Sequence, residues 1–339
     1  MRDFVDSTDI VADGDALAER MARDGYLFIR GLVPAAAVAE AGRVFAEIVA
    51  EAGWLLPGTP IGDRIADPDR ACFDPQPHFL EVYSRFYRLQ ITHALKRHPA
   101  IIGFLERLLG GEVLAHPLHV IRNVFPGREA FTTRPHQDYV HIQGTPETYT
   151  VWLPLHDCPR EMGGLAIAEA SHLDGVRDFA VCSGAGGLEV IEPFEGQWRS
   201  GDFKLGDALV FHSMNVHKSL DNRSDSIRHS MDPRYQRADQ PILEVSMRPY
   251  SGCGGWDEIY ADWASDELKY YWRRQDPTVE AFDWQYYERR DEMAFALAEQ
   301  GDETARATLM RIVQRDPTPE KQARASSVLA TLDRHAAGA

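Results

Sequence analysis

The chain has 339 residues, 44% of them hydrophobic and 26% charged, with a formal net charge of -16 at pH 7. This composition predicts a globular protein with a large core, and the negative charge argues against nucleic acid as a partner. No stretch approaches the roughly 18 consecutive apolar residues that span a membrane, and the acidic start does not resemble a signal peptide. The four cysteines show no Cys-x-x-Cys spacing, which argues against common zinc and thioredoxin motifs and suggests a reducing, cytoplasmic compartment.

The first third of the chain predicts helices around one short strand, because apolar residues recur at helical spacing on both sides of a Gly-bounded apolar run. The predicted elements are a helix over residues 9–22, a strand over 26–31, a helix over 34–52, and a helical region over 79–110 in two pieces that separate near Pro99. Residues 53–78 are rich in Pro, Gly and Asp and predict a long loop. We expect residues 1–112 to pack on the core.

From residue 113 the pattern changes to short runs of β-branched and aromatic residues separated by turn signals. Strands are expected over residues 118–125, 149–155, 163–167, 208–211, 228–234 and 243–247. Regular short strands of this kind indicate an antiparallel sandwich or barrel. Neither a Gly-x-Gly-x-x-Gly motif after a strand nor a Gly-Lys-Ser/Thr loop occurs, which argues against a nucleotide-phosphate site. Residues 113–254 are the expected core.

Beyond residue 255 the chain predicts helices again. An aromatic-rich segment is followed by helical patterns over residues 291–300, 304–314 and 319–332. We expect residues 255–339 to form a helical C-terminal extension that covers a sheet edge or makes a dimer contact. The oligomeric state is left open between a monomer and a homodimer.

Metal-ligating residue types occur at a suggestive spacing in His136-Gln137-Asp138. On a strand, residues two apart point to the same face, so this imidazole and carboxylate could bind one metal ion. His172-Leu173-Asp174 has the same spacing, so the spacing alone does not discriminate between them. A third ligand is expected from a later strand, with His212 and His217 as candidates. Two His and one carboxylate form the triad of non-haem Fe(II) oxygenases.

A cosubstrate with two carboxylates would also need a cation, and the planar guanidinium of arginine suits a carboxylate. Arg228 follows His217 across the turn Asp221-Asn222-Arg223-Ser224, which places it on the neighbouring strand of a hairpin. It could face the same cavity as the triad. The alternative is a surface arginine paired with an aspartate.

Over roughly residues 24 to 236 the sequence resembles the phytanoyl-CoA dioxygenase-like family of Fe(II)/2-oxoglutarate-dependent oxygenases. The resemblance is carried by Asp24-Gly25-Tyr26, His136-Gln137-Asp138, Val151-Trp152-Leu153, Met162-Gly163-Gly164-Leu165, Ala170-Ser171-His172, Gly206-Asp207, Phe211-His212, His217-x-Ser219, Asn222 and Arg228. Ala170 departs from the family, which usually has Gly before Ser-His. The implied fold is mainly β with flanking helices: a double-stranded β-helix (jelly roll, cupin-like) core plus the helical extension.

The resemblance also implies roles for particular residues. His136, Asp138 and His217 would bind Fe(II), which leaves His172-Leu173-Asp174 as a decoy. Arg228, with Ser219 beside it, would bind the distal carboxylate of 2-oxoglutarate. The remaining cosubstrate contacts are expected from Trp152, which would line the pocket, and from Thr150 or Asn123.

The implied activity is oxidation of a small-molecule substrate by O2, with release of succinate and CO2, through hydroxylation or through oxidative cyclisation or desaturation. Substrate contacts are expected from Tyr139, His141, Gln143 and Arg122, with the loop 53–78 as a lid. The acidic balance favours a polar, amine-bearing, natural-product or amino-acid-like substrate. Two alternatives stay open: a cupin-type metalloenzyme without 2-oxoglutarate, and a catalytically silent jelly-roll binding protein.

Overall fold

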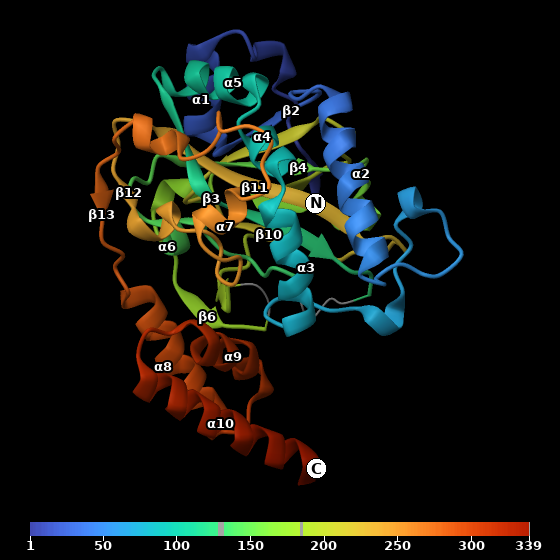
Figure 1. The fold of residues 1–339 in the computed structure, drawn as a ribbon. Helices are drawn as coiled ribbons and strands as arrows, with labels where there is room; N and C mark the ends of the chain where they lie inside the picture. Colours follow the sequence, from blue (N-terminus) through green and yellow to red (C-terminus); the bar gives the residue numbers. More distant parts are fainter. Residues whose placement is uncertain (128–131, 184–185, 339) are drawn as a thin grey trace.

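A sandwich of two β-sheets forms the centre of the protein in a computed structural model, which describes residues 1–127, 132–183 and 186–338 (Figure 1). The larger sheet has entirely antiparallel neighbours. Its order is β2 (Tyr26–Ile29), β9 (Ala208–His212), β4 (Thr148–Pro154), β11 (Arg228–Arg237) and β3 (Val113–Val124).

The smaller sheet has the order β1 (Arg2–Asp3), β8 (Trp198–Ser200), β5 (Leu165–Ala168) and β10 (His217–Ser219). Beyond β10, the backbone of Thr133 and His136 continues the hydrogen bonding: Ser219 N donates to Thr133 O over 3.0 Å, and His136 N donates to His217 O over 2.9 Å. This extension brings the first candidate metal ligand onto the sheet that carries the last one.

Apolar side chains from both sheets meet between them, since alternate residues of a strand point to the same face. Trp152 of β4 and Phe203 pack edge to face with ring centres 4.6 Å apart. The cluster consists of Phe4, Tyr26, Phe28, Trp152, Cys158, Met162, Leu165, Ile167, Phe203, Leu209 and Phe211. These residues occupy one part of the inter-sheet space, and polar side chains occupy another.

Helices from the N-terminal part cover the outer face of the larger sheet (Figure 1). They are α1 (Gly14–Asp24), α2 (Ala35–Glu51), α3 (Pro77–Arg88), α4 (Gln90–Lys96) and α5 (Pro99–Leu109). Local signals explain α1: the Asp13 side chain caps its start by accepting from Ala16 N, and Gly25 ends it with a φ of 79°. Phe45 of α2 packs on the outward-facing His229 of β11, with ring centres 5.9 Å apart.

Several expectations for the elements need correction. Helical residues make up 41% of the chain and strand residues 21%, so "mainly β" describes the core alone. The region 79–110 holds three helices rather than two, because α3 also ends at Leu89, whose extended backbone caps α4. The strand expected over 243–247 is limited to β12 (Ile242–Leu243), and a 3-10 turn occupies Glu244–Met247. The expected loop 53–78 contains two 3-10 turns.

The C-terminal part contributes to two separate cores. The aromatic segment that includes α7 (Trp256–Tyr260) packs into the main core. Helices α8 (Gln285–Glu299), α9 (Arg306–Arg315) and α10 (Pro319–Gly338) form a second core of their own and project below the sandwich in Figure 1. We call these three helices the C-terminal lobe.

Two small sheets join the parts. The hairpin of β6 (Phe179–Val181) and β7 (Leu188–Val190) contacts the C-terminal lobe through Val181, and β12 pairs with β13 (Val279–Glu280) just before α8. Within the described ranges, no helix combines the length and the apolar character needed to cross a membrane.

Candidate metal centre and cosubstrate pocket

Three buried side chains, those of His136, Asp138 and His217, converge between the sheets, with one potential ligand atom from each within 4.8 Å of the others. His136 Nδ1 lies 2.8 Å from the carbonyl oxygen of Arg134, and His217 Nδ1 lies 3.0 Å from that of Asn215. A carbonyl oxygen can only accept, so both Nδ1 atoms carry the proton and both Nε2 atoms keep a lone pair. In metal sites, a hydrogen bond from the ring nitrogen that does not bind the metal commonly orients the imidazole, and these two Nδ1 hydrogen bonds are of that kind.

The reason why His136 and Asp138 meet differs from the one expected. His136 lies in a β-bridge to His217, but Asp138 has helical backbone angles and precedes α6 (Tyr139–Ile142). The expected strand carrying both residues is therefore wrong in detail. A turn, rather than strand alternation, brings the carboxylate to the imidazole.

The Asp138 carboxylate is held by two neighbours. Thr150 donates from Oγ1 over 2.6 Å, and Arg234 donates from Nη2 and Nε over 2.7 and 3.2 Å. Burial is the largest single influence and disfavours the charged carboxylate, but the charge and hydrogen bonds of Arg234 together with the neighbouring imidazoles outweigh it and hold the pKa of Asp138 well below its ordinary value. Burial lowers the pKa of both His136 and His217, which favours the neutral imidazoles that a metal requires.

Sequence reasoning missed Arg234. In the β11–β4 register it stands opposite Thr150, so the two side chains share the face that carries the site. The available signal was its place six residues after Arg228 on one predicted strand. That signal was incomplete, because the pairing of β11 with β3 shifts between Pro233 and Tyr235.

Beside the triad, a narrow cavity between the sheets holds the buried side chain of Arg228, which is 1% exposed. Its Nη1 donates to Ser219 Oγ over 3.0 Å and to the carbonyl oxygen of Gly163, and its guanidinium carbon lies 5.7 Å from the ring centre of Trp152. Gly163 has a φ of 78°, and a Cβ there would lie 2.4 Å from the carbonyl oxygen of Leu220, so only glycine fits without a shift.

Donors in this cavity lack acceptors. Among the described residues, Arg228 Nε and Trp152 Nε1 are buried without a hydrogen-bond partner. Burial lowers the pKa of Arg228, which shows that its charge is poorly compensated. A carboxylate would satisfy both deficits, because it accepts several hydrogen bonds and carries the opposite charge. The cavity therefore fits the distal carboxylate of 2-oxoglutarate, and the triad fits Fe(II).

One expected cosubstrate contact faces the wrong way. Asn123 pairs with His229 in the β3–β11 register, and its Oδ1 lies 2.7 Å from His229 Nδ1. Both side chains point to the helix-covered face, whereas the neighbouring Arg122 points into the site. Asn123 is therefore excluded as a cosubstrate contact by strand alternation. Thr150 does line the cavity, with its hydroxyl on Asp138.

A larger cavity of ≈ 550 Å³ adjoins the triad and extends to the C-terminal lobe. Of the expected substrate contacts, Arg122 and His141 line it, and Tyr139 and Gln143 do not. The Gln143 side chain is bonded to the backbone of Asp283 instead: its Nε2 donates to Asp283 O over 2.8 Å, and its Oε1 accepts from Asp283 N over 2.9 Å. From the loop expected to be a lid, Asp74 reaches the cavity.

The charge of this cavity differs from that of the chain. Its lining contains six arginines and four aspartates, although the whole chain has a net charge of -16. The acidic balance thus does not extend to the space beside the triad. It gives no support to the expectation of an amine-bearing substrate.

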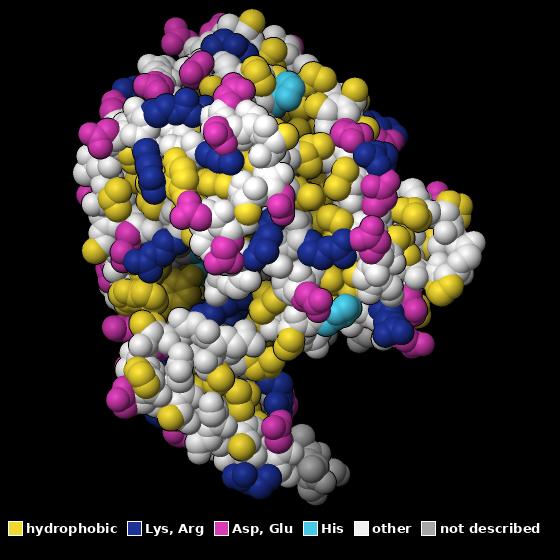
Figure 2. Space-filling view, viewed as in Figure 1, with side chains coloured by type: hydrophobic (Ala, Val, Ile, Leu, Met, Phe, Trp, Pro, Cys, Tyr) yellow, Lys and Arg dark blue, Asp and Glu magenta, His cyan; other side chains and the backbone are white. Residues whose placement is uncertain are grey.

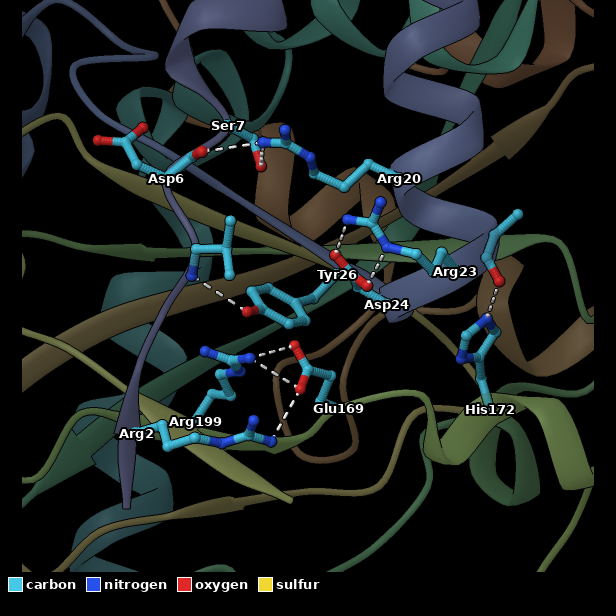
Figure 3. A network of polar contacts seen from close by, with 12 residues as sticks. Arg2, Asp6, Ser7, Arg20, Arg23, Asp24, Tyr26, Glu169, His172 and Arg199 are labelled. Carbon is cyan, nitrogen blue, oxygen red and sulfur yellow. Dashed lines mark hydrogen bonds and ion pairs between the residues drawn. The ribbon is translucent and has the colours of Figure 1, made fainter. Parts of the chain in front are cut away.

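The second His-x-Asp sequence lies elsewhere. Figure 3 shows His172 at the edge of a polar network that ties the N-terminal segment to the smaller sheet, with Nε2 pointing at the carbonyl oxygen of Ala22, 3.1 Å away. Asp174 pairs with Arg177. His212 packs against Tyr149 and lies 3.6 Å from Glu147, outside the triad.

Comparisons with known proteins find relatives of this chain. The 1-deoxypentalenic acid 11-beta-hydroxylase of Streptomyces exfoliatus is 27% identical over 278 residues, which are 77% of this chain and 93% of that protein. The phytanoyl-CoA dioxygenase domain-containing protein 1 of Danio rerio is 28% identical over 163 residues, 45% of this chain and 53% of that protein.

Solved structures that resemble the chain include the epimerase SnoN in complex with Fe3+, alpha ketoglutarate and nogalamycin RO. It has 21% identity, a TM-score of 0.49, and covers 67% of this chain and 85% of its own. The non-heme monooxygenase ThoJ in its apo form has 18% identity, a TM-score of 0.49, and covers 93% of this chain and 99% of its own.

The family model of phytanoyl-CoA dioxygenase (PhyH) matches residues 21–230, a span that contains all three residues of the triad and Arg228. The chain therefore belongs to the phytanoyl-CoA dioxygenase family of non-haem iron, 2-oxoglutarate-dependent enzymes.

Proposed function

We propose that His136, Asp138 and His217 bind Fe(II), and that the enzyme uses 2-oxoglutarate and O2 to hydroxylate a small natural-product-like molecule. The observation that carries this proposal is the convergence of two neutral imidazoles and one ionised carboxylate within 4.8 Å in a buried site. When bound, the iron and its cosubstrate supply the oxidising chemistry, with succinate and CO2 as products. The protein binds, orients and excludes water.

The cosubstrate contacts follow from the narrow cavity. Arg228 and Ser219 hold the distal carboxylate, and Trp152 forms the wall and donates from Nε1. Thr150 and Arg234 keep the Asp138 carboxylate ionised and oriented. Arg234 acts only through Asp138 in this scheme and is a positioning residue.

We also propose that the core is a jelly roll comprising residues 113–254. Eight core strands follow in the order β3, residues 133–136, β4, β5, β8, β9, β10 and β11. Numbered one to eight, they are ordered 1-8-3-6 in the larger sheet and 2-7-4-5 in the smaller one. Consecutive strands thus repeatedly cross from sheet to sheet, as in two Greek keys. Residues 1–112 then add β2 and the covering helices, and residues 255–339 add the C-terminal lobe.

Hydroxylation is favoured over oxidative cyclisation or desaturation by the similarity to the 1-deoxypentalenic acid 11-beta-hydroxylase, of which the chain covers 93%. The cavity of ≈ 550 Å³ fits a small molecule. Identification of the product would distinguish hydroxylation from cyclisation and desaturation.

The test is release of labelled CO2 from 2-oxoglutarate by Fe(II)-loaded protein in air, with ascorbate present to supply the two electrons that the substrate would otherwise give. Wild type and His172→Ala should both release CO2, because His172 belongs to the second His-x-Asp sequence away from the triad. Asp138→Ala and His217→Ala should not. Release that survives Asp138→Ala would contradict the ligand assignment. No release from iron-loaded wild type would favour a cupin-type metalloenzyme without 2-oxoglutarate, or a binding protein.

A further inference from the structure

The C-terminal lobe supplies one wall of the cavity beside the triad. Tyr287, Arg290 and Asp291 reach it from α8, and Arg311 and Arg315 reach it from α9. In Figure 2 the surface is hollowed at the junction between the sandwich and the lobe, where yellow apolar and dark blue basic side chains gather. The family match ends at residue 230, so these residues lie outside it.

The lobe is linked to the metal site through His141, which is a neighbour of the triad. Tyr287 Oη of α8 lies 2.8 Å from His141 Nδ1, and the rings of His141 and His136 are 6.2 Å apart. The two hydrogen bonds between Gln143 and the backbone of Asp283 hold the segment just before α8. The arginines of the lobe therefore have defined positions relative to the triad.

Arg290 and Arg311 are 6% and 5% exposed and approach each other at the tip of the β6–β7 hairpin. The position of a Cβ on Gly187 lies 3.6 Å from Arg290 Cδ and 3.4 Å from Arg311 Nη1. Arg315 follows Arg311 by one helical turn on the same face of α9. Three guanidinium groups are thus assembled on the lobe side of one cavity.

Their ion pairs leave positive charge in excess. Asp74 forms ion pairs with two arginines, at 2.7 Å from Arg315 and 3.7 Å from Arg311. Asp291 forms ion pairs with Arg290 and Lys321, each at 2.6 Å, and Asp316 also pairs with Lys321. Among the described residues, these four cations and three carboxylates leave one positive charge. The pKa of Arg311 is lowered, first by burial and then by the charges of Arg315 and Arg290 against Asp74, whereas the pKa of Arg315 is raised because Tyr250 and Asp74 outweigh burial there.

About half of the remaining lining residues are apolar or aromatic. They come from β3, from the segment after β12, from the segment before α8 and from α9: Leu118, Val120, Val245, Pro249, Tyr250, Phe282, Trp284 and Ile312. A ligand that complements this cavity has an apolar skeleton and one anionic end. A single excess charge matches a carboxylate, whereas a dianionic phosphate would bring a second, uncompensated charge.

We infer that Arg290, Arg311 and Arg315 of the C-terminal lobe bind the carboxylate of an apolar acid whose skeleton extends across the cavity toward the triad. The identification of this acid as the substrate rests on the proposed oxygenase function. The binding itself does not, because it needs neither iron nor 2-oxoglutarate. The lobe is then the specificity element of the enzyme, and its arginines select acids over neutral and cationic analogues.

The test compares three probes of equal chain length: decanoate, decanamide and decylamine. Each is titrated calorimetrically into the full-length protein, first without metal and then anaerobically with Fe(II) and saturating 2-oxoglutarate. Wild type should bind decanoate at least about tenfold more tightly than decanamide, as expected for charged hydrogen bonds. Arg311→Gln and, separately, Arg315→Gln should remove this preference. Arg289→Gln is the matched control, because Arg289 lies on α8 but is exposed and pairs with Asp178.

Equal binding of acid and amide by wild type, preference for the amine, or no binding of decanoate at millimolar concentration would each overturn the inference. So would an acid preference that survives both substitutions in folded protein. Arg228→Ala separates this site from the cosubstrate pocket, because it should weaken binding of 2-oxoglutarate and leave binding of decanoate unchanged. Arg311→Gln should weaken binding of decanoate and leave binding of 2-oxoglutarate unchanged. If the oxygenase proposal fails, the acid preference of the metal-free protein should still be found.

Discussion

Replacing Arg228 by alanine should remove recognition of the distal carboxylate of 2-oxoglutarate. The guanidinium is 1% exposed, and among the described residues its Nε has no partner. Leaving a buried charge without its partner costs about 3–5 kcal/mol, which corresponds to roughly 100-fold to 4,000-fold in Kd. We expect the lower part of this range, because water can enter the space that the side chain leaves.

The assay is anaerobic calorimetry on Fe(II)-loaded protein with two ligands, 2-oxoglutarate and 2-oxopentanoate. The second has the same chain length and the same chelating end but carries a methyl group in place of the distal carboxylate. Wild type should prefer 2-oxoglutarate strongly, and Arg228→Ala should bind both ligands with similar affinity. Arg199→Ala is the control, because Arg199 pairs with Glu169 in the network of Figure 3, away from the cavity. A variant that retains the wild-type preference would refute the assignment.

Three further changes test the supporting structure. Arg234→Met should lower the unfolding free energy of metal-free protein by about 3–5 kcal/mol in chemical denaturation, because Asp138 stays buried without its cation. The control is Arg237→Met on the same strand, where the arginine is half-buried and pairs with the exposed Asp239. Equal losses of unfolding free energy in the two variants would contradict the role of Arg234. Gly163→Ala should weaken 2-oxoglutarate binding and destabilise the fold by at least about 1 kcal/mol, whereas Gly31→Ala, also at positive φ but with open space around it, should leave 2-oxoglutarate binding intact. Burial lowers the pKa of His116 to about 3, so between pH 6.5 and 5 the unfolded chain takes up a proton there that the folded chain does not. The unfolding free energy of wild type should therefore fall by about 2 kcal/mol more than that of His116→Gln between pH 6.5 and 5. If the unfolding free energies of the two proteins fall in parallel with pH, the effect is excluded.

Those residues of the candidate site that belong to short sequence motifs were predictable from the sequence. His136, Asp138, His217 and Arg228 come together in one region between the sheets, as the order of their motifs implied. The geometry behind the first pair was not predictable, because a bridge followed by a helical turn has no distinct signal in three residues. Asn123 was misplaced for a related reason. A one-residue change in strand register reverses the face of every side chain, and the register of β3 is set by β11.

Long-range packing explains what the sequence did not reveal. The three helices of the C-terminal lobe were predicted as helices, but their position depends on Tyr287 meeting His141 and on Gln143 meeting Asp283. Neither contact leaves a pattern in sequence periodicity. The basic lining of the cavity was hidden for the same reason, since its arginines are spread from Arg122 to Arg315 within a chain that is acidic overall.

The most direct test of the central claim is the visible absorption spectrum of the anaerobic protein titrated with Fe(II) and 2-oxoglutarate. Our account predicts a metal-to-cosubstrate charge-transfer band in wild type and in His172→Ala, and no band in His217→Ala. Absence of the band from folded, iron-bound wild type, or its persistence in His217→Ala, would contradict the assignment of this site.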